Sequence, residues 1–194
     1  MGIALQATFA APLPALPRAG ELAALGAVLC LSRARPGSEL SGWAQAARAE
    51  VASGCDSNGP CEALWMFDHD GRCCWRLYLL PDSDFLAWDS LAARLPVHHQ
   101  PRTGGVGERL WTRLAGCLRG ERWHAVPLRL HARSGGPGFS RCGDTGLSAT
   151  WPVLSAAGQA AARRIARIEG VEGDTLDDAI ARPYPMIHPT RRHP

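Results

Sequence analysis

Lysine is absent from this sequence of 194 residues, so every one of its 21 basic residues is an arginine. The net charge is only +3, and the chain has neither an RNP-like motif nor the cysteine and histidine spacing of a zinc finger. These absences predict that nucleic acid is not a partner. No apolar run approaches the roughly 20 residues that a membrane-spanning helix needs, and residues 1–20 lack the basic start of a secretory signal. We therefore expect a cytoplasmic protein without membrane insertion.

The composition is that of an ordinary globular protein, with 46% hydrophobic and 20% charged residues. A chain of this length can bury roughly 70% of the surface that it exposes when unfolded, so it needs no disulfide or metal to fold. Prolines cluster near both ends of the chain. We expect residues 1–17 to form an extended N-terminal arm, residues 18–182 a single domain and residues 183–194 an irregular C-terminal tail.

The cysteines form no C-x-x-C pair, and reduced thiols are expected in a cytoplasm. The seven are Cys30, Cys55, Cys61, Cys73, Cys74, Cys117 and Cys142. Loop-forming residues separate Cys55 from Cys61, so these two thiols could meet and form a metal site or a regulatory disulfide. Cys73 and Cys74 are adjacent, and adjacent residues of a strand point to opposite faces of a sheet, which disfavours chelation of one ion by both.

The clearest local pattern is a β-hairpin followed by a helix. Two apolar runs, 62–67 and 72–80, flank an Asp-Gly turn at 68–71, and such a pair between apolar runs is a strong hairpin signal. Along the second run, residues 75, 77 and 79 share the face expected in the core, whereas residues 74, 76 and 78 share the other. We expect Pro81 to end this strand. The apolar stripe of a helix then extends to about residue 95, with Asp82 or Ser83 as its N-terminal cap.

Elsewhere the pattern predicts a buried strand at 26–32, a helix at 40–52, a loop at 53–60 and a polar linker at 97–107. Further helices are expected at 108–118 and 158–169, and a strand at 121–133. Pro127 interrupts that last strand, which indicates a position at the sheet edge or a β-bulge. Together these elements predict the α+β class, with a mostly antiparallel sheet and helices packed on it.

Residues 64–95, LWMFDHDGRCCWRLYLLPDSDFLAWDSLAARL, resemble the end of one structural repeat in bacterial haem-utilisation proteins of the HemS/ChuX type, the hemin transport or hemin-degrading factors. Residues 22–37 resemble an earlier strand of the same repeat. The matching positions are Gly26, Val28, Leu31, Arg33, Phe67, Asp68, Gly71, Tyr78, Trp88, Leu91 and Leu95. The family's second repeat is absent. We therefore interpret residues 18–182 as a shortened, divergent α+β haem-utilisation-like domain.

The resemblance implies that the chain binds or carries haem in bacterial haem-iron utilisation, with assistance in haem degradation as a related role. Such a site needs an axial donor to the iron, an apolar slot and basic residues for the two propionates. The candidate cofactor-binding residues are His98, His99, Arg102, His124, Arg129 and His131, of which His98 and His99 are the candidate iron ligands. Trp75, Trp111 and Trp123 could stack on the porphyrin. On a regular strand, His124 and His131 lie on opposite faces, and only a bulge at Pro127 would bring them to one face.

Two other functions stay open. A haem-family fold that has lost its ligand could act as a non-catalytic module that binds a protein partner or forms a homodimer. The other is a thiol-based regulator that uses Cys55 and Cys61. We predict no catalytic residues, since the G-x-S-x-G motif of hydrolases is absent. A binding protein is therefore expected rather than an enzyme, and any enzymatic role would be a haem-degrading, oxygenase-like activity.

Overall fold

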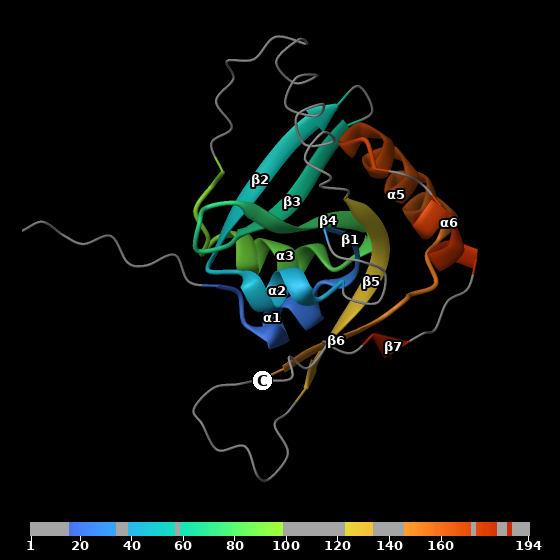
Figure 1. Cartoon of the computed structure of the whole chain (residues 1–194). Coiled ribbons are helices and arrows are strands. Elements are labelled where there is room, and N and C mark those ends of the chain that lie inside the picture. Colours follow the sequence, from blue (N-terminus) through green and yellow to red (C-terminus); the bar gives the residue numbers. More distant parts are fainter. Residues whose placement is uncertain are drawn as a thin grey trace, which may run out of the picture.

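The computed structural model describes residues 16–33, 39–56, 59–98, 123–133, 146–171, 174–181 and 186–187. Within these ranges, seven strands form one antiparallel sheet in the order β2-β3-β4-β1-β5-β6-β7 (Figure 1). The strands are β1 (Gly26–Ser32), β2 (Arg48–Asp56), β3 (Gly59–Phe67), β4 (Cys73–Ser83), β5 (His124–Arg133), β6 (Gly146–Thr150) and β7 (Met186–Ile187). The helices are α1 (Ala19–Ala24), α2 (Ser41–Gln45), α3 (Phe85–Ala92), α5 (Ala156–Glu169) and α6 (Asp174–Ala181). This arrangement confirms the predicted α+β class with a mostly antiparallel sheet.

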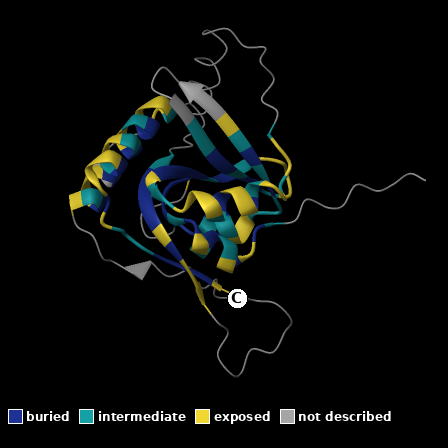
Figure 2. Cartoon of the chain, turned by 180° about the vertical axis from the view of Figure 1, so that it is seen from behind, coloured by how far each residue is buried: buried dark blue, intermediate teal, exposed yellow. Residues whose placement is uncertain are grey.

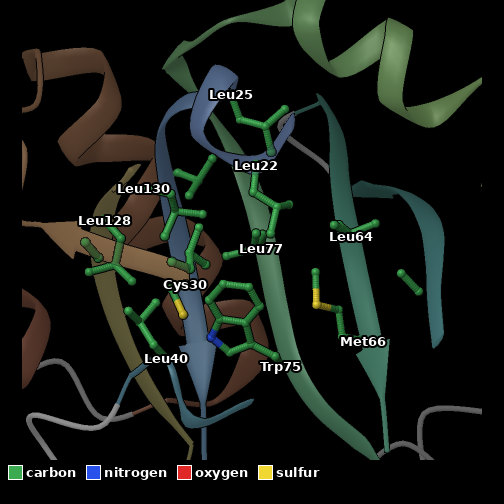
Figure 3. Packing of buried hydrophobic residues seen from close by; sticks show 14 of the residues in the cluster. Leu22, Leu25, Cys30, Leu40, Leu64, Met66, Trp75, Leu77, Leu128 and Leu130 are labelled. Carbon is green, nitrogen blue, oxygen red and sulfur yellow. The ribbon is translucent and has the colours of Figure 1, made fainter. Parts of the chain in front are cut away.

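Helices cover both faces of the sheet, and the strands between them are the most buried part of the molecule (Figure 2). Helices α1, α2 and α3 pack on one face, where Leu22 and Trp88 join the buried cluster around Trp75. Helices α5 and α6 pack on the other face through Ile165 and Leu176. Trp75 is fully buried at the centre of the first cluster (Figure 3). The apolar area that an aromatic side chain buries makes it a main contributor to core stability.

The predicted hairpin is present as β3 and β4. One carboxylate oxygen of Asp68 accepts hydrogen bonds from the backbone N–H groups of Asp70 (3.0 Å) and Arg72 (2.8 Å). Gly71 has a φ of +75°, a conformation that glycine adopts without a steric penalty. The strand continues past Pro81 to residue 83, so the prediction that this proline ends it was wrong. The helix that follows is capped one residue later than expected, by Asp84, whose side chain accepts a bond from the Ala87 N–H (2.9 Å).

Residues 40–60 differ from the prediction. Only Ser41–Gln45 is helical, whereas residues 48–56 belong to strand β2 and residues 59–60 to strand β3. Alanine, glutamate and arginine favour helices only weakly, and tertiary context overrides that preference. The pairing of β2 along the whole of β3 supplies this context. The period-two pattern is also present, because Ala49 and Val51 are buried in the core cluster of one sheet face while Arg48 and Glu50 alternate with them.

Strand β5 lies between β1 and β6, so the prediction of an edge position was wrong. Its register with both neighbours is continuous, without a bulge at Pro127. Pro127 is opposite Leu29 of β1, whereas the pairing with β6 begins only at Arg129. A proline has no N–H to donate to a neighbouring strand. Here it lies where β6 no longer runs alongside, so the missing donor breaks no pair between β5 and β6.

Helix α5 is attached to β4 at both of its ends. At the first turn, the two carboxylate oxygens of Asp82 accept hydrogen bonds from the backbone N–H (3.0 Å) and the hydroxyl (3.1 Å) of Ser155. Gly158 lies so close to this carboxylate that an added Cβ would overlap it. The last residue, Glu169, bonds to side chains of β4 that are described below. The orientation of α5 on the sheet is therefore fixed by polar contacts as well as by apolar packing.

Several predictions fall partly or wholly outside the described residues. The expected helix at 108–118 and most of the linker at 97–107 are among these, as are residues 1–15 of the predicted arm. Two residues of the expected irregular tail, 186–187, form β7 beside β6. Among the described residues, none of the helices has both the length and the apolar character required to cross a membrane.

Candidate functional site

The structure does not bring the predicted site residues together. His98 lies beyond the free edge of β2, whereas His124, Arg129 and His131 lie on β5, four strands from β2 in the sheet order. At about 4.8 Å between strands, β2 and β5 are about 19 Å apart along the sheet, and His98 lies one strand spacing further away. His99 and Arg102 lie outside the described residues. The continuous register of β5 places His124 and His131 on opposite faces, and the exposed His131 ring bonds to the Thr150 hydroxyl (2.9 Å).

His98 is held in place by the free edge of β2. The Val51 N–H donates to the Pro96 carbonyl (2.8 Å), and the His98 N–H donates to the Val51 carbonyl (2.6 Å). Val51 and Val97 thereby form a short parallel bridge. Residues 96–98 thus act as a short extra strand that covers part of the sheet edge and fixes the backbone from which the His98 ring projects.

The imidazole of His98 is oriented by a carboxylate. Its Nδ1 lies 2.5 Å from one oxygen of Glu50, and the other oxygen of Glu50 pairs with Arg48. The ring also packs on Trp65 and Phe67, at centroid distances of 4.7 and 5.6 Å. In the neutral ring, this carboxylate favours the tautomer with the proton on Nδ1 and the lone pair on Nε2. Metal-binding histidines commonly show the same carboxylate support.

The pairing of β2 with β3 explains how these side chains meet. Arg48 is opposite Phe67, and Glu50 is opposite Trp65. Directly opposed residues project from the same face of an antiparallel pair. The two charged residues of β2 and the two aromatic residues of β3 therefore share one face, and His98 reaches them from the edge.

Arginine and aromatic side chains continue from His98 across the sheet. The Arg48 guanidinium carbon lies 4.0 Å from the centroid of the Phe67 ring. The Arg76 guanidinium carbon lies 4.2 Å from the Trp65 ring and 4.7 Å from the Trp123 ring, with Arg33 on the same indole at 4.9 Å. We call this set the cation–aromatic row; its members are Arg48, Phe67, His98, Trp65, Arg76, Trp123 and Arg33. Stacking of guanidinium groups on aromatic faces is favourable, and more so where water is excluded.

Glu169 anchors the middle of the row. Its carboxylate accepts hydrogen bonds from the Arg76 guanidinium (2.6 Å) and from the Tyr78 hydroxyl (2.8 Å). Burial and the neighbouring Glu169 charge raise the pKa of Tyr78 well above its ordinary value. Burial alone would lower the pKa of Arg76, but the Cys73 and Glu169 groups raise it overall. Both side chains of β4 are thus held in one protonation state at neutral pH.

One polar atom of the row lacks a partner. The indole Nε1 of Trp65 is buried and has no hydrogen-bond acceptor in the described part of the chain. Buried donors are nearly always paired in folded proteins. This indole lies between His98 and Arg76, so an oxygen atom of a ligand placed on the row could accept its hydrogen bond.

A pocket of about 150 Å³ lies beside α2 at the start of β4. It is smaller than the roughly 300–1,000 Å³ of typical pockets for small molecules. No cluster of three or more histidine, cysteine or acidic residues suited to a metal occurs in the ranges that the structure describes. Among the described residues, the imidazole of His98 with its Glu50 partner is the group that could hold an iron ion.

Most members of the row were not predicted from the sequence. Of its residues, only His98 and Trp123 were named as candidates for iron binding or stacking. Arg48 and its partner Glu50 were missed because residues 40–52 were expected to be helical. Trp65 and Phe67 lie on a strand that was predicted, but its pairing with residues 48–50 was not. The signal was present, since charged residues at 48 and 50 and aromatic residues at 65 and 67 each recur with the period of two that strands have. No protein-family model matches the chain, and no curated protein matches it.

Proposed function

We propose that the chain binds haem on the cation–aromatic row, with Nε2 of His98 as the axial donor to the iron. The observation that carries this proposal is the short contact between His98 Nδ1 and Glu50, 2.5 Å long, beside two aromatic rings. A carboxylate in this position makes the ring a better donor and keeps it in one orientation. Trp65 and Phe67 pack on the imidazole and help to hold its orientation. The resemblance to haem-utilisation proteins also leads us to expect a histidine that binds the iron.

The propionates would bind to guanidinium groups of the row. Arg48 is the more accessible of the two nearest arginines, with 35% of its side chain exposed, against 18% for Arg76. An arginine and a carboxylate can form two parallel hydrogen bonds. A propionate oxygen could also accept the unpartnered N–H of Trp65. On this basis we propose a cytoplasmic haem carrier of iron utilisation, in which the bound haem would supply any oxygen chemistry and the protein would bind and orient it.

A hemin titration followed by absorbance tests the proposal. We expect a shifted Soret band at one equivalent, and a loss of affinity of about 10- to 100-fold in Glu50→Gln, which removes the charge behind the imidazole. His98→Ala should show no Soret shift, because the proposed axial donor to the iron is gone. His131→Ala is the matched control, because this exposed histidine lies on β5 and should leave the titration unchanged.

Two results would overturn the proposal: a flat titration of the wild-type chain, or an unchanged spectrum in a folded His98→Ala variant. Circular dichroism of each variant shows whether it has folded. A flat titration would favour the second candidate, a non-catalytic interaction module. Helix α3 provides the observation behind that candidate, since its adjacent Phe85 and Leu86 are 51% and 81% exposed. Light scattering of the purified chain would then show whether it forms a homodimer.

A further inference from the structure

Three basic side chains follow one another along the end of β5. Arg129, His131 and Arg133 occupy alternate positions of this strand, and alternate residues of a strand project from the same face. The register with β6 is continuous through all three positions, so no bulge disturbs the alternation. All three residues are exposed (Figure 2), whereas Ala125, earlier on the same face, is buried in the cluster that includes Ile165 of α5. We call Arg129, His131 and Arg133 the basic stripe.

The positive charges of the basic stripe are not neutralised within the described part of the chain. There, neither Arg129 nor Arg133 has a carboxylate within ion-pair distance. The Nε2 of His131 lies 2.9 Å from the Thr150 hydroxyl. With this hydroxyl as the donor, the neutral ring has its proton on Nδ1 and can donate it to an outside acceptor. The stripe therefore presents two guanidinium groups and one ring N–H to solvent.

The spacing of the basic stripe is that of an extended peptide. Its members are two residues apart, which is about 6.6–6.8 Å along a strand. An extended acidic segment repeats its side chains at the same interval, so carboxylates at every second residue can meet all three groups at once. Each arginine can bind one carboxylate through two parallel hydrogen bonds. Both the charge and the spacing of the stripe thus match an acidic segment in the extended conformation.

The surroundings of the basic stripe favour a peptide over a single-stranded nucleic acid. Proteins that bind single strands combine basic groups with aromatic rings on which the bases stack. The residues of β6 opposite the stripe are Gly146, Ser148 and Thr150, and Arg129 is opposite Ala27 on the β1 side. None of these neighbours is aromatic, so the stripe offers charge without a stacking platform.

We propose that the basic stripe is a docking surface for an acidic segment of a partner protein, which binds in an extended conformation with carboxylates at alternate positions. The stripe lies on β5, four strands from β2 in the sheet order, so this interaction does not use His98 and does not depend on haem. Because its groups are exposed, the contact should be weak, reversible and reduced by salt.

Nuclear magnetic resonance of the full isotope-labelled chain tests this proposal with two peptide isomers. One alternates its residues, Ser-Glu-Ser-Glu-Ser-Glu-Ser. The other, Ser-Ser-Glu-Glu-Glu-Ser-Ser, has the same charge but cannot place all three carboxylates on one side of an extended chain. We expect the alternating peptide to shift the amide signals of β5 and β6 saturably, with a Kd in the millimolar range. The block isomer loses one contact and should bind about threefold to fivefold more weakly.

Variants separate the stripe from the overall charge of the protein. Arg133→Gln should weaken binding of the alternating peptide by about threefold to fivefold. Arg167→Gln is the matched control, because it removes the same charge from an exposed position on α5 and should leave binding unchanged. Both side chains are exposed, so both variants should fold, and the dispersion of their spectra shows whether they do.

Several outcomes would refute the proposal: no saturable shift, equal affinity for the two isomers, shifts centred outside β5 and β6, or an equal loss in Arg167→Gln. The comparison of the isomers needs only the wild-type chain, so it decides the question even if a variant does not fold. A single-stranded oligothymidylate of the same charge is the competing ligand. Tighter binding of this oligonucleotide than of the alternating peptide would assign the stripe to nucleic acid instead.

Discussion

Replacing Glu169 by alanine should destabilise the fold strongly, because one carboxylate serves two partly buried partners. Its removal leaves Arg76 without its carboxylate and the Tyr78 hydroxyl without its acceptor. Breaking a fully buried ion pair costs about 3–5 kcal/mol. The two charged side chains are 18% and 21% exposed, so solvent reduces this to about 2–3 kcal/mol. An unsatisfied hydroxyl adds about 1 kcal/mol. The total, about 3–4 kcal/mol, is a large share of the 5–15 kcal/mol by which proteins are typically stable.

Urea unfolding followed by tryptophan fluorescence and circular dichroism measures this loss. With a slope of about 2 kcal/mol per molar urea, the midpoint should fall by about 1.5–2 M. Asp177→Ala is the control, because its ion pair with Arg163 joins side chains that are 64% and 46% exposed. Such surface pairs contribute about 0–1 kcal/mol. A loss below 1 kcal/mol in Glu169→Ala, no larger than in the control, would show that the carboxylate does not anchor α5.

Three further predictions concern stability and are checked by urea unfolding. In Gly42→Ala, the new Cβ would lie 2.7 Å from the Cys74 carbonyl oxygen, so a loss of about 1–3 kcal/mol is expected; Gly20→Ala, with open space around it, should instead gain about 0.5–1 kcal/mol. Burial raises the pKa of both Cys74 and Tyr78, so these two groups lose their protons at a lower pH in the unfolded chain than in the folded one. The free energy of unfolding should therefore fall as the pH rises from about 9 towards 11. A free energy of unfolding that is constant over this window would contradict these shifts. Asp84→Ala removes the cap of α3 and should lower stability by about 1 kcal/mol, and no change would mean that the cap is dispensable.

Local patterns predicted the parts of the fold that depend on neighbouring residues. The Asp-Gly turn between β3 and β4 and the helix expected at 158–169 needed only short-range information, and the structure confirms both, with the helix beginning two residues earlier. Strand β2 was missed because its residues have a slight helical preference that pairing with β3 overrides. Pro127 was wrongly expected at a sheet edge because the end of β6 could not be predicted. The pairing of β5 with β6 begins at Arg129, so the proline lies where no hydrogen bond to β6 is needed.

The candidate site was less predictable because its contacts join distant parts of the chain. His98 and Glu50 are 48 residues apart, and Arg76 and Glu169 are 93 apart. The resemblance to haem-utilisation proteins made His98 a candidate ligand, but it gave no indication of the carboxylate beside the imidazole.

The double attachment of α5 means that the strand beneath it determines how long this helix can be. From Asp82 to Arg76 the strand covers about 20 Å at 3.3 Å per residue, and the 14 residues of α5 cover about 21 Å. One inserted residue would rotate the far end of the helix by about 100° and carry Glu169 away from Arg76. We therefore expect that insertions and deletions within α5 destabilise the fold, even at exposed positions where substitutions are tolerated.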